Sequence, residues 1–267
     1  MSQKISKIPV ILIHRGKHDY VQTCINQAKF YNEKVIVISD SEYENCDNVN
    51  ILEYTTHSNE FRKYYTPLST LGDYELFCFL RWFILYEYMT KENVDNVFYI
   101  DSDVLLYHNV TDDIEFFNNY IFTLILRSVG CTSYFTTGGL KMFCKFLFEI
   151  YQQKNSYEFA KIASHYKVRQ EFNLPGGVCD MTLFEYFARY KCSVGVGELS
   201  NIRDNTTYDH NINDSDNMYE FNGIKKIEFV DKKPFCYSPV LDKKIQFKSI
   251  HFQGGSKHLM DTYKTYE

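Results

Sequence analysis

The sequence predicts an α/β fold with a central, mainly parallel sheet flanked by helices, and two patterns carry this prediction. A β-branched run over 8–13 is followed by a turn, an amphipathic helix over 20–28 and a second β-branched run over 35–38. This order is a βαβ unit, which implies parallel strands and a right-handed crossover. A further apolar run over 97–100 ends in Asp101-Ser102-Asp103. Open sheets of this kind bind ligands beyond the carboxyl ends of their strands, so the acidic pair is predicted to lie at a ligand site.

Other polar residues end the predicted strands in the same way. His14 and Arg15 follow the first strand, and Ser39 and Asp40 follow the second. Because the carboxyl ends of parallel strands meet at one edge, we expect these residues to lie beside the acidic pair.

Asp101 and Asp103 stand only one residue apart. Like charges this close raise each other's pKa unless a cation lies between them, so a divalent metal is the natural resolution. Carboxylate oxygens favour Mg²⁺ or Mn²⁺ over Zn²⁺. Two protein carboxylates also leave coordination positions open for a phosphate-bearing substrate. The alternative is that one aspartate caps a turn while the other is solvated.

Composition excludes some classes of function. The 267 residues carry a formal charge of −5, which offers no basic face for nucleic acid. Aromatic residues make up 17% of the chain, which suits a sugar-binding groove but also fits biased codon usage. Eight cysteines include no C-x-x-C pair, so neither a zinc site nor a redox pair is expected.

Two further observations concern the compartment. Residues 1–7 contain no apolar signal segment, and the most apolar run, over 76–89, is too short to span a bilayer. We therefore expect a cytoplasmic protein with no transmembrane segment.

The remaining elements follow from periodicity and from turn residues. Asp73 is the expected cap of a helix over 74–90, and Asp180 lies in the first turn of a helix over 181–190. The other predictions are a strand over 50–53, a loop over 54–72, a strand region over 116–126, a helix over 142–151 and a peripheral strand over 224–230. No linker divides the chain, which predicts a single domain over 1–267.

Arg81 stands inside the almost wholly apolar helix predicted over 74–90. Its neighbours one turn away are Phe77 and Leu85, so no carboxylate on its own face can neutralise it. A partly buried guanidinium must find its anion elsewhere, either a structural aspartate or a bound diphosphate. The alternative is an arginine whose stem is buried while its charged head reaches solvent.

The C-terminal tail carries a second group of chemically capable residues. His251 is followed by Gly254 and then Lys257, a composition expected of a loop that folds over a phosphate. His251 is a candidate third metal ligand, Gly254 allows close approach of the backbone, and Lys257 can neutralise a departing diphosphate.

Taken together, the Asp101-Ser102-Asp103 motif, the helix bearing Arg81-Trp82 and the tail from His251 to Lys257 resemble the metal-dependent glycosyltransferases of family 8. That family includes glycogenin and bacterial lipopolysaccharide galactosyltransferases. The resemblance covers most of the chain and implies the GT-A fold. Its Rossmann-like nucleotide-sugar and metal half would span 8–113, and a smaller acceptor half with the closing loop would span 114–267.

The resemblance also implies roles for individual residues. Asp101, Asp103 and His251 would hold Mn²⁺ or Mg²⁺, a UDP-sugar would be the donor, and a glycan or another hydroxyl compound would be the acceptor. Lys257 and Asp180 would serve catalysis, with Asp180 near the anomeric carbon. The donor-binding candidates are His14, Arg15, Tyr20, Asp40, Arg81, Ser102, Gly138, Gly139, Gly254 and Lys257. Tyr20 resembles the residue that stacks on uracil, while Gly138 and Gly139 occupy the place of the family's Asn-x-Gly segment without its asparagine.

The predicted reaction is therefore transfer of a hexose or pentose from UDP, with retention implied by the family. One alternative is a haloacid-dehalogenase-type phosphatase that uses Asp101 as nucleophile and Asp103 as general acid. Its motif normally lies on the first strand, whereas about three elements precede Asp101 here. The other alternative is a non-catalytic module that binds a sugar nucleotide.

Overall fold

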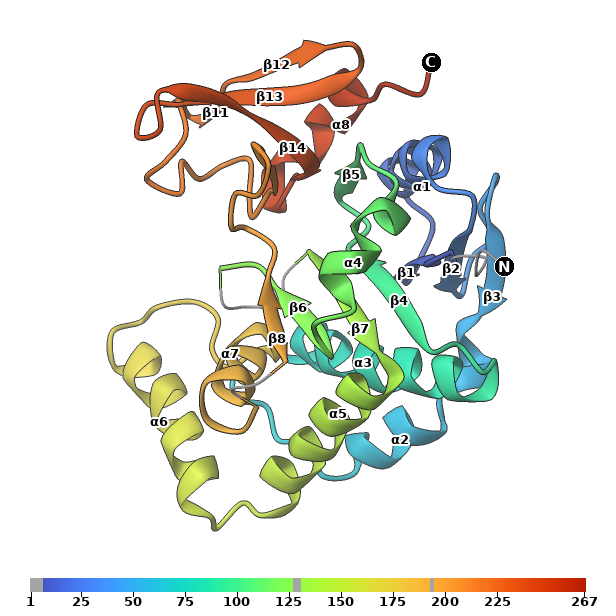
Figure 1. Cartoon of the computed structure of the whole chain (residues 1–267). Helices are drawn as coiled ribbons and strands as arrows, with labels where there is room; N and C mark the ends of the chain where they lie inside the picture. The colour runs from blue at the N-terminus through green and yellow to red at the C-terminus, as the bar shows by residue number, and fades with distance from the viewer. Residues whose placement is uncertain (1–6, 127–130, 193–194) are drawn as a thin grey trace.

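The computed structural model describes residues 7–126, 131–192 and 195–267, and its centre is a seven-stranded sheet (Figure 1). The strands lie in the order β3-β2-β1-β4-β7-β6-β8. Their bounds are β1 Val10–His14, β2 Val35–Ser39, β3 Asp47–Asn50, β4 Asn96–Ile100, β6 Phe122–Leu124, β7 Thr132–Thr136 and β8 Val196–Glu198. The pairs β1·β2, β1·β4, β2·β3 and β6·β8 are parallel, whereas β7 runs antiparallel to β4 and β6. The predicted α/β fold with a mainly parallel sheet is confirmed.

The helices lie on both faces of this sheet. Their bounds are α1 Asp19–Tyr31, α2 Thr56–Arg62, α3 Gly72–Lys91, α4 Ile114–Phe117, α5 Thr137–Gln152, α6 Tyr157–Glu171, α7 Asp180–Tyr190 and α8 Met260–Tyr263. The predicted βαβ unit is β1, α1 and β2, with β1 parallel to β2 from Val10 to His14.

Two hydrophobic cores lie on opposite faces of the sheet, because successive side chains of a strand point to opposite sides. Ile11 and Ile13 of β1 join one core with α3, α5 and α7, whereas Val10 and Leu12 join the other with α1 and the C-terminal strands. A strand buried on both faces needs a continuous apolar run rather than an alternating one, which explains the sequence of β1.

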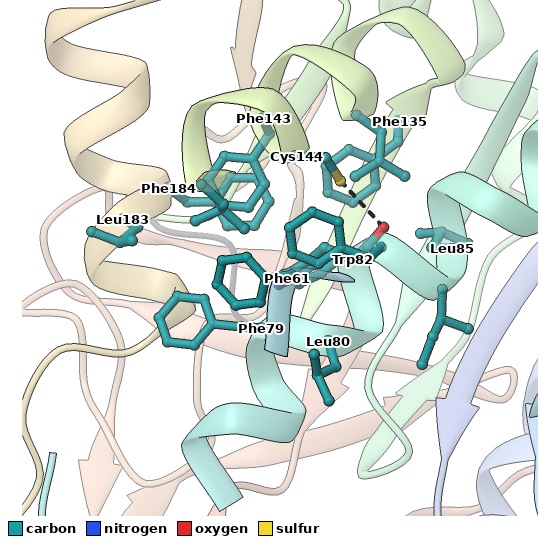
Figure 2. Close-up of a cluster of buried hydrophobic side chains, with 14 of the residues drawn as sticks. Phe61, Phe79, Leu80, Trp82, Leu85, Phe135, Phe143, Cys144, Leu183 and Phe184 are labelled. Atoms are coloured by element: carbon teal, nitrogen blue, oxygen red, sulfur yellow. Dashed lines mark hydrogen bonds between the residues drawn. The ribbon is translucent and has the colours of Figure 1, made fainter. Parts of the chain in front are cut away.

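Aromatic packing fixes α3 in the first core (Figure 2). The Trp82 ring makes edge-on contacts with Tyr99 and Phe184, at centroid distances of 4.9 and 5.1 Å. The Cys144 thiol donates a hydrogen bond of 3.5 Å to the backbone oxygen of Trp82, which Figure 2 marks as a dashed line. Such aromatic pairs add to the stabilisation from burial and hold the turn of α3 that carries Arg81.

A second sheet brings the C-terminal tail to the acidic pair. It has the order β12-β13-β14-β5, and β9 pairs with β14 at one side. The bounds are β5 Val104–Leu106, β9 Thr206–Tyr208, β12 Ile227–Val230, β13 Lys233–Ser238 and β14 Lys243–His251, with a small hairpin of β10 Phe221–Asn222 and β11 Ile224–Lys225. β14 runs antiparallel to β5 and places His251 opposite Val104. Because Val104 follows Asp103 directly, this pairing places His251 beside the acidic pair, at the carboxyl end of β4.

Several element predictions need correction. Residues 51–54 form a 3₁₀ helix and not a strand, because the Asn50 side chain accepts the Leu52 N–H at 3.0 Å and starts a turn. The expected loop over 54–72 contains α2, whose Phe61 ring stacks on Phe83 at 4.7 Å and is fully buried. Of the region 116–126, only Phe122–Leu124 is a strand.

The helix limits also differ from the prediction. Leu71 stands at the N-cap of α3, and Asp73 lies in its first turn instead. α5 begins earlier than predicted, because Thr136 Oγ1 accepts the Gly139 N–H at 3.0 Å and caps it. The sequence analysis missed α6, which is sparse in buried residues and therefore weakly periodic.

None of the helices in the described part of the chain combines the length and apolar character that a bilayer span requires.

Candidate active site

The carboxyl ends of β1, β2 and β4 meet at one edge of the central sheet, as their parallel pairing requires. His14 Nδ1 and Ser102 Oγ share a hydrogen bond of 3.0 Å, which joins the end of β1 to the acidic motif. Asp40 Oδ1 accepts the Gly16 N–H at 2.7 Å and so fixes the turn between β1 and α1. Gly16 has a φ of +79°, which favours glycine there.

Asp101 and Asp103 lie in the short turn between β4 and β5. The Val104 N–H donates to the Asp101 carbonyl at 3.2 Å, and the Asp101 N–H donates to the Cys131 carbonyl at 2.7 Å. On the other side, the Phe252 N–H donates to the Asp103 carbonyl at 2.9 Å. The backbone of the acidic motif is thus held on one side by Cys131, which directly precedes β7, and by the tail on the other.

His251 lies at the end of β14 with both ring nitrogens in defined surroundings. Its Nδ1 lies 2.7 Å from the His210 carbonyl, which can only accept, so Nδ1 carries a proton. Its Nε2 lies 3.4 Å from Asp103 Oδ1. A backbone carbonyl on Nδ1 is the usual arrangement that orients a metal-binding imidazole and leaves Nε2 as the ligand atom.

The geometry fits a divalent cation. One ligand atom from each of Asp101, Asp103 and His251 lies within 4.8 Å of the other two. Carboxylate oxygens suit Mg²⁺ and Mn²⁺, and imidazole suits transition metals, so the mixed set favours Mn²⁺. Asp103 and His251 are buried, which limits competition from water. These residues are the ones that would hold the metal.

Lys257 reaches the same carboxylate from the tail. Its Nζ lies 3.1 Å from Asp103 Oδ2 and 5.3 Å from the centroid of the Tyr20 ring. The ring centroids of Tyr20 and His14 lie 6.0 Å apart, so α1, which carries Tyr20, contributes to this edge of the sheet. Gly254 opens the last 3₁₀ turn, Gly254–Leu259, with a φ of +64°. The structure therefore brings both halves of the predicted constellation together.

The surroundings separate the pKa values of the two aspartates. Burial is the main cause that raises the pKa of Asp101, and the charge of Asp103 adds to it. Burial acts in the same direction on Asp103, but hydrogen bonds and charges from His251 and Lys257 lower its pKa to about 2. For His251, burial alone would lower the pKa, yet Cys131 and Asp103 hold it well above its ordinary value.

Arg81 finds its anions within the protein. One terminal nitrogen lies 2.5 Å from Asp101 Oδ1, and the other lies 2.7 Å from Asp180 Oδ2. The Tyr99 hydroxyl donates to the same Asp101 oxygen at 2.6 Å. Of the alternatives left open by the sequence, the structure shows structural aspartates as the partners of Arg81, and its contact with a diphosphate stays a prediction.

Asp180 is a partner of α3 rather than an exposed carboxylate. Its side chain is 2% exposed, and its Oδ2 accepts the Trp82 indole N–H at 2.8 Å as well as the Arg81 contact. Its Oδ1 accepts the Met181 N–H at 3.0 Å. Both oxygens are therefore engaged in the fold, which argues against direct contact with a sugar.

Gly138 and Gly139 do not lie at the edge of the sheet that carries Asp101. β7 runs antiparallel to β4, and its last residue, Thr136, pairs with Asn96 at the opposite end of β4. A Cβ on Gly139 would meet the Ile121 carbonyl at 2.4 Å, so close packing explains this glycine. The predicted donor contact is thus corrected, because the sequence does not reveal the direction of β7.

The start of β7 reaches the site instead. Thr132 pairs with Ile100, and the adjacent Cys131 is a fully buried neighbour of His251. Sequence reasoning missed these residues and also Tyr99, whose hydroxyl binds Asp101. The one feature of the sequence that could have indicated Tyr99 is its place in an apolar strand, two residues before Asp101.

Arg15 extends from the end of β1 toward α3. Its guanidinium carbon lies 4.2 Å from the centroid of the Phe77 ring, which is the distance of a cation–π contact. Burial and the nearby Arg62 lower its pKa.

Comparisons with known proteins give matches to solved structures alone. No protein-family model matches the chain, and no curated protein matches it. Mouse xyloside xylosyltransferase 1, in its apo form, is 8% identical with a TM-score of 0.44, covering 75% of this chain and 88% of that chain.

Two other matched structures are a cytidylyltransferase and a glycosyltransferase. A cytidylyltransferase from Leptospira borgpetersenii is 10% identical with a TM-score of 0.41, covering 74% of this chain and 77% of its own. The glycosyltransferase GlyE from Streptococcus pneumoniae is 12% identical with a TM-score of 0.38, covering 73% of this chain and 45% of its own. At these TM-scores the likenesses carry no argument about what this chain does.

Proposed function

We propose that the chain is a metal-dependent glycosyltransferase of the GT-A fold that moves a hexose or pentose from a UDP-sugar to a hydroxyl acceptor, with retention. The observation that carries the proposal is the convergence of Asp101, Asp103 and His251, whose ligand atoms lie within 4.8 Å of one another. Lys257 stands beside them, 3.1 Å from Asp103. Two carboxylates, an imidazole and a lysine at the carboxyl edge of a parallel sheet suit a nucleoside diphosphate and its metal.

The chemical difficulty of glycosyl transfer is the negative charge that develops on the departing diphosphate. A bound Mn²⁺ would supply electrophilic stabilisation of that charge. Lys257 supplies a second positive charge from a side chain that is only 36% exposed, where electrostatic stabilisation exceeds that in open water. In the ligand-free chain its charge is balanced by Asp103, so this lysine is already positioned at the site.

Donor recognition falls to residues around the β1–α1 turn. Tyr20 offers an aromatic face beside Lys257, which suits stacking of a uracil ring. Asp40 lines a cavity of about 390 Å³ together with Ser39, Asn48 and Asn50, whose polar groups suit a base or a ribose. His14 pairs with Ser39 of this cavity and shares a hydrogen bond of 3.0 Å with Ser102 of the acidic motif.

Arg81 and Asp180 receive revised roles in the proposal. Arg81 holds the carboxylate of Asp101 in place, and Asp180 holds Arg81. Both are positioning residues. The catalytic assignment of Asp180 gives way to this one because both of its oxygens are engaged.

The phosphatase alternative is less well supported by the surroundings of Asp101. Asp101 Oδ1 binds both Arg81 and Tyr99, and the motif follows the fourth strand of the fold, whereas the phosphatase motif normally lies on the first. A non-catalytic module would show UDP binding with no sugar transfer or hydrolysis, which distinguishes it from the proposed enzyme.

A thermal-shift panel of nucleotide sugars with and without Mn²⁺ tests the proposal. A ligand that binds only the folded state at 100 times its Kd adds about 2.7 kcal/mol of stability. We expect UDP-sugars to raise the Tm only when Mn²⁺ is present, and D103N to lose that response. Equal shifts without metal, or phosphate release from a generic phosphomonoester with no sugar transfer, would overturn it.

A further inference from the structure

Lys225 is a fully buried lysine in β11 and is not one of the proposed metal ligands. Its ammonium group has an acceptor for each of its three protons. These are Asp209 Oδ1 at 2.6 Å, Asp216 Oδ2 at 2.5 Å and the Asn211 carbonyl at 2.9 Å. All three acceptors belong to one segment, residues 209–216, which we call the 209–216 loop. The loop is therefore folded around a single internal cation.

The 209–216 loop in turn holds His251 from three sides. Asp209 Oδ2 accepts the His251 N–H at 3.1 Å, and the His210 carbonyl accepts from His251 Nδ1 at 2.7 Å. The Ile212 N–H donates to the His251 carbonyl at 2.9 Å. These contacts fix the backbone of His251 and the rotation of its imidazole ring. The position of Nε2 relative to Asp103 therefore depends on the shape of this loop.

The same loop also holds the turn that carries Lys257. The Asn211 side-chain amide donates to Gln253 Oε1 at 2.8 Å. The Asn213 amide donates to the Gln253 carbonyl at 3.0 Å and to Ser256 Oγ at 3.1 Å. One loop thus positions both tail residues that the proposed function needs.

We infer that Lys225 is a positioning residue that sets His251 and the Lys257 turn in their metal- and diphosphate-binding geometry, an inference that rests on the proposed function. Removing the ammonium group leaves the buried Asp209 carboxylate without a cation and leaves Asp216 with His210 alone, whose Nδ1 lies 3.3 Å from Asp216 Oδ1. Buried carboxylates without a partner are costly, so the loop must rearrange or admit water. Asp209 touches the His251 backbone directly, and the rearrangement therefore reaches the imidazole.

The chain offers a matched control in Lys248. This lysine lies in β14, the strand of His251, and is also buried, and it binds both oxygens of Asp113 at 2.6 and 2.8 Å. Its partners lie outside the 209–216 loop. K225M and K248M each remove one buried ammonium group from a carboxylate, but only K225M should disturb His251.

The test measures Mn²⁺ affinity from the signal of free Mn²⁺ in electron paramagnetic resonance, alongside the Tm. We expect K225M to weaken Mn²⁺ binding about tenfold, the lower end of the effect of supporting residues around a metal, and K248M to leave it unchanged. Equal Mn²⁺ affinity in K225M and wild type, or equal weakening in K248M, would overturn the inference. If wild type itself bound no Mn²⁺, the proposed function would fail together with it.

A milder variant keeps the test decisive if K225M does not fold. D216N retains Lys225 and Asp209 but removes one of the two carboxylate contacts of Lys225, at a residue that is 12% exposed. We expect faster amide hydrogen exchange at His251 and in residues 253–256, with weaker Mn²⁺ binding. Unchanged exchange at these positions in D216N would contradict the role given to Lys225.

Discussion

The two aspartates of the central motif are one residue apart yet lie in different surroundings. Asp101 binds Arg81 and Tyr99, which belong to the buried helix α3 and to strand β4. Asp103 binds His251 and Lys257, both of which come from the C-terminal tail. The first carboxylate therefore has partners that are part of the core, and the second has partners that are part of the site.

We therefore expect substitutions around Asp101 to affect mainly the stability of the fold, and substitutions around Asp103 to affect mainly ligand binding. The partners of Asp101 cannot leave without exposing a buried charge, so that side of the motif is structural. Lys257 is partly exposed and holds Asp103 through one contact, so it can turn to a diphosphate when a cation takes its place. The three predictions that follow test this division.

Substitution of Arg81 should have the largest effect on stability. R81M leaves Asp101 and Asp180 without their shared cation, and breaking a buried pair in this way costs about 3–5 kcal/mol. Urea unfolding measures the loss. R15M, which removes an exposed arginine from the same edge, serves as control and should change stability by less than about 1 kcal/mol. Similar losses in the two variants would remove the structural role given to Arg81.

Substitution of Lys257 should affect turnover and not stability. K257M should lower kcat for sugar transfer roughly 10²- to 10³-fold, the usual effect of removing one group that stabilises developing charge. The free energy of unfolding should change by less than about 1 kcal/mol, because the ion pair is partly exposed. Steady-state kinetics with a UDP-sugar donor and Mn²⁺ provide the measurement. Turnover close to wild type would mean that the departing charge is stabilised elsewhere.

Glu75 of α3 provides a further test of the buried side of the motif, where Arg81 and Asp180 lie. Burial, with the charge of Asp180 adding to it, raises the pKa of Glu75 from 4.5 to about 7. The folded chain therefore binds this proton more tightly than the unfolded chain, so the stabilisation is present at low pH and is lost as the pH rises from about 4.5 to 7.

E75Q keeps a neutral side chain at every pH and should lose this dependence. Relative to wild type it should gain roughly 1–3 kcal/mol between pH 5 and pH 8, since a tenfold change in proton affinity corresponds to about 1.4 kcal/mol. Urea unfolding at both pH values gives the difference. A constant difference between the two proteins would show that Glu75 does not titrate in this range.

The sequence was informative where chemistry and periodicity are local. The β-branched runs of β1 and β2 predict parallel strands because such strands are buried on both faces, and the strand end before Asp101 marks the ligand edge. The composition of the tail made His251 a candidate metal ligand and the family resemblance supported it, but no local pattern showed its contact with Asp103, because the pairing of β14 with β5 joins segments far apart in the chain.

The remainder depends on long-range contacts that no local pattern encodes. The direction of β7 decides that Cys131, and not Gly138, lies beside Asp101. Arg81 was recognised as a charge in need of a partner, but its partner Asp180 lies on a different helix. Lys225 gave no signal at all, since a lysine in a short strand is ordinarily exposed.

The central claim is that residue 251 and the two aspartates bind one cation. Pulsed electron paramagnetic resonance of the Mn²⁺ complex with UDP tests it most directly, because a coordinated imidazole nitrogen couples to the metal. We predict a directly bound ¹⁴N signal in wild type that disappears in H251Q, while Mn²⁺ still binds more weakly through the two carboxylates. Bound Mn²⁺ with no nitrogen coupling in wild type, or the same coupling in H251Q, would contradict the account.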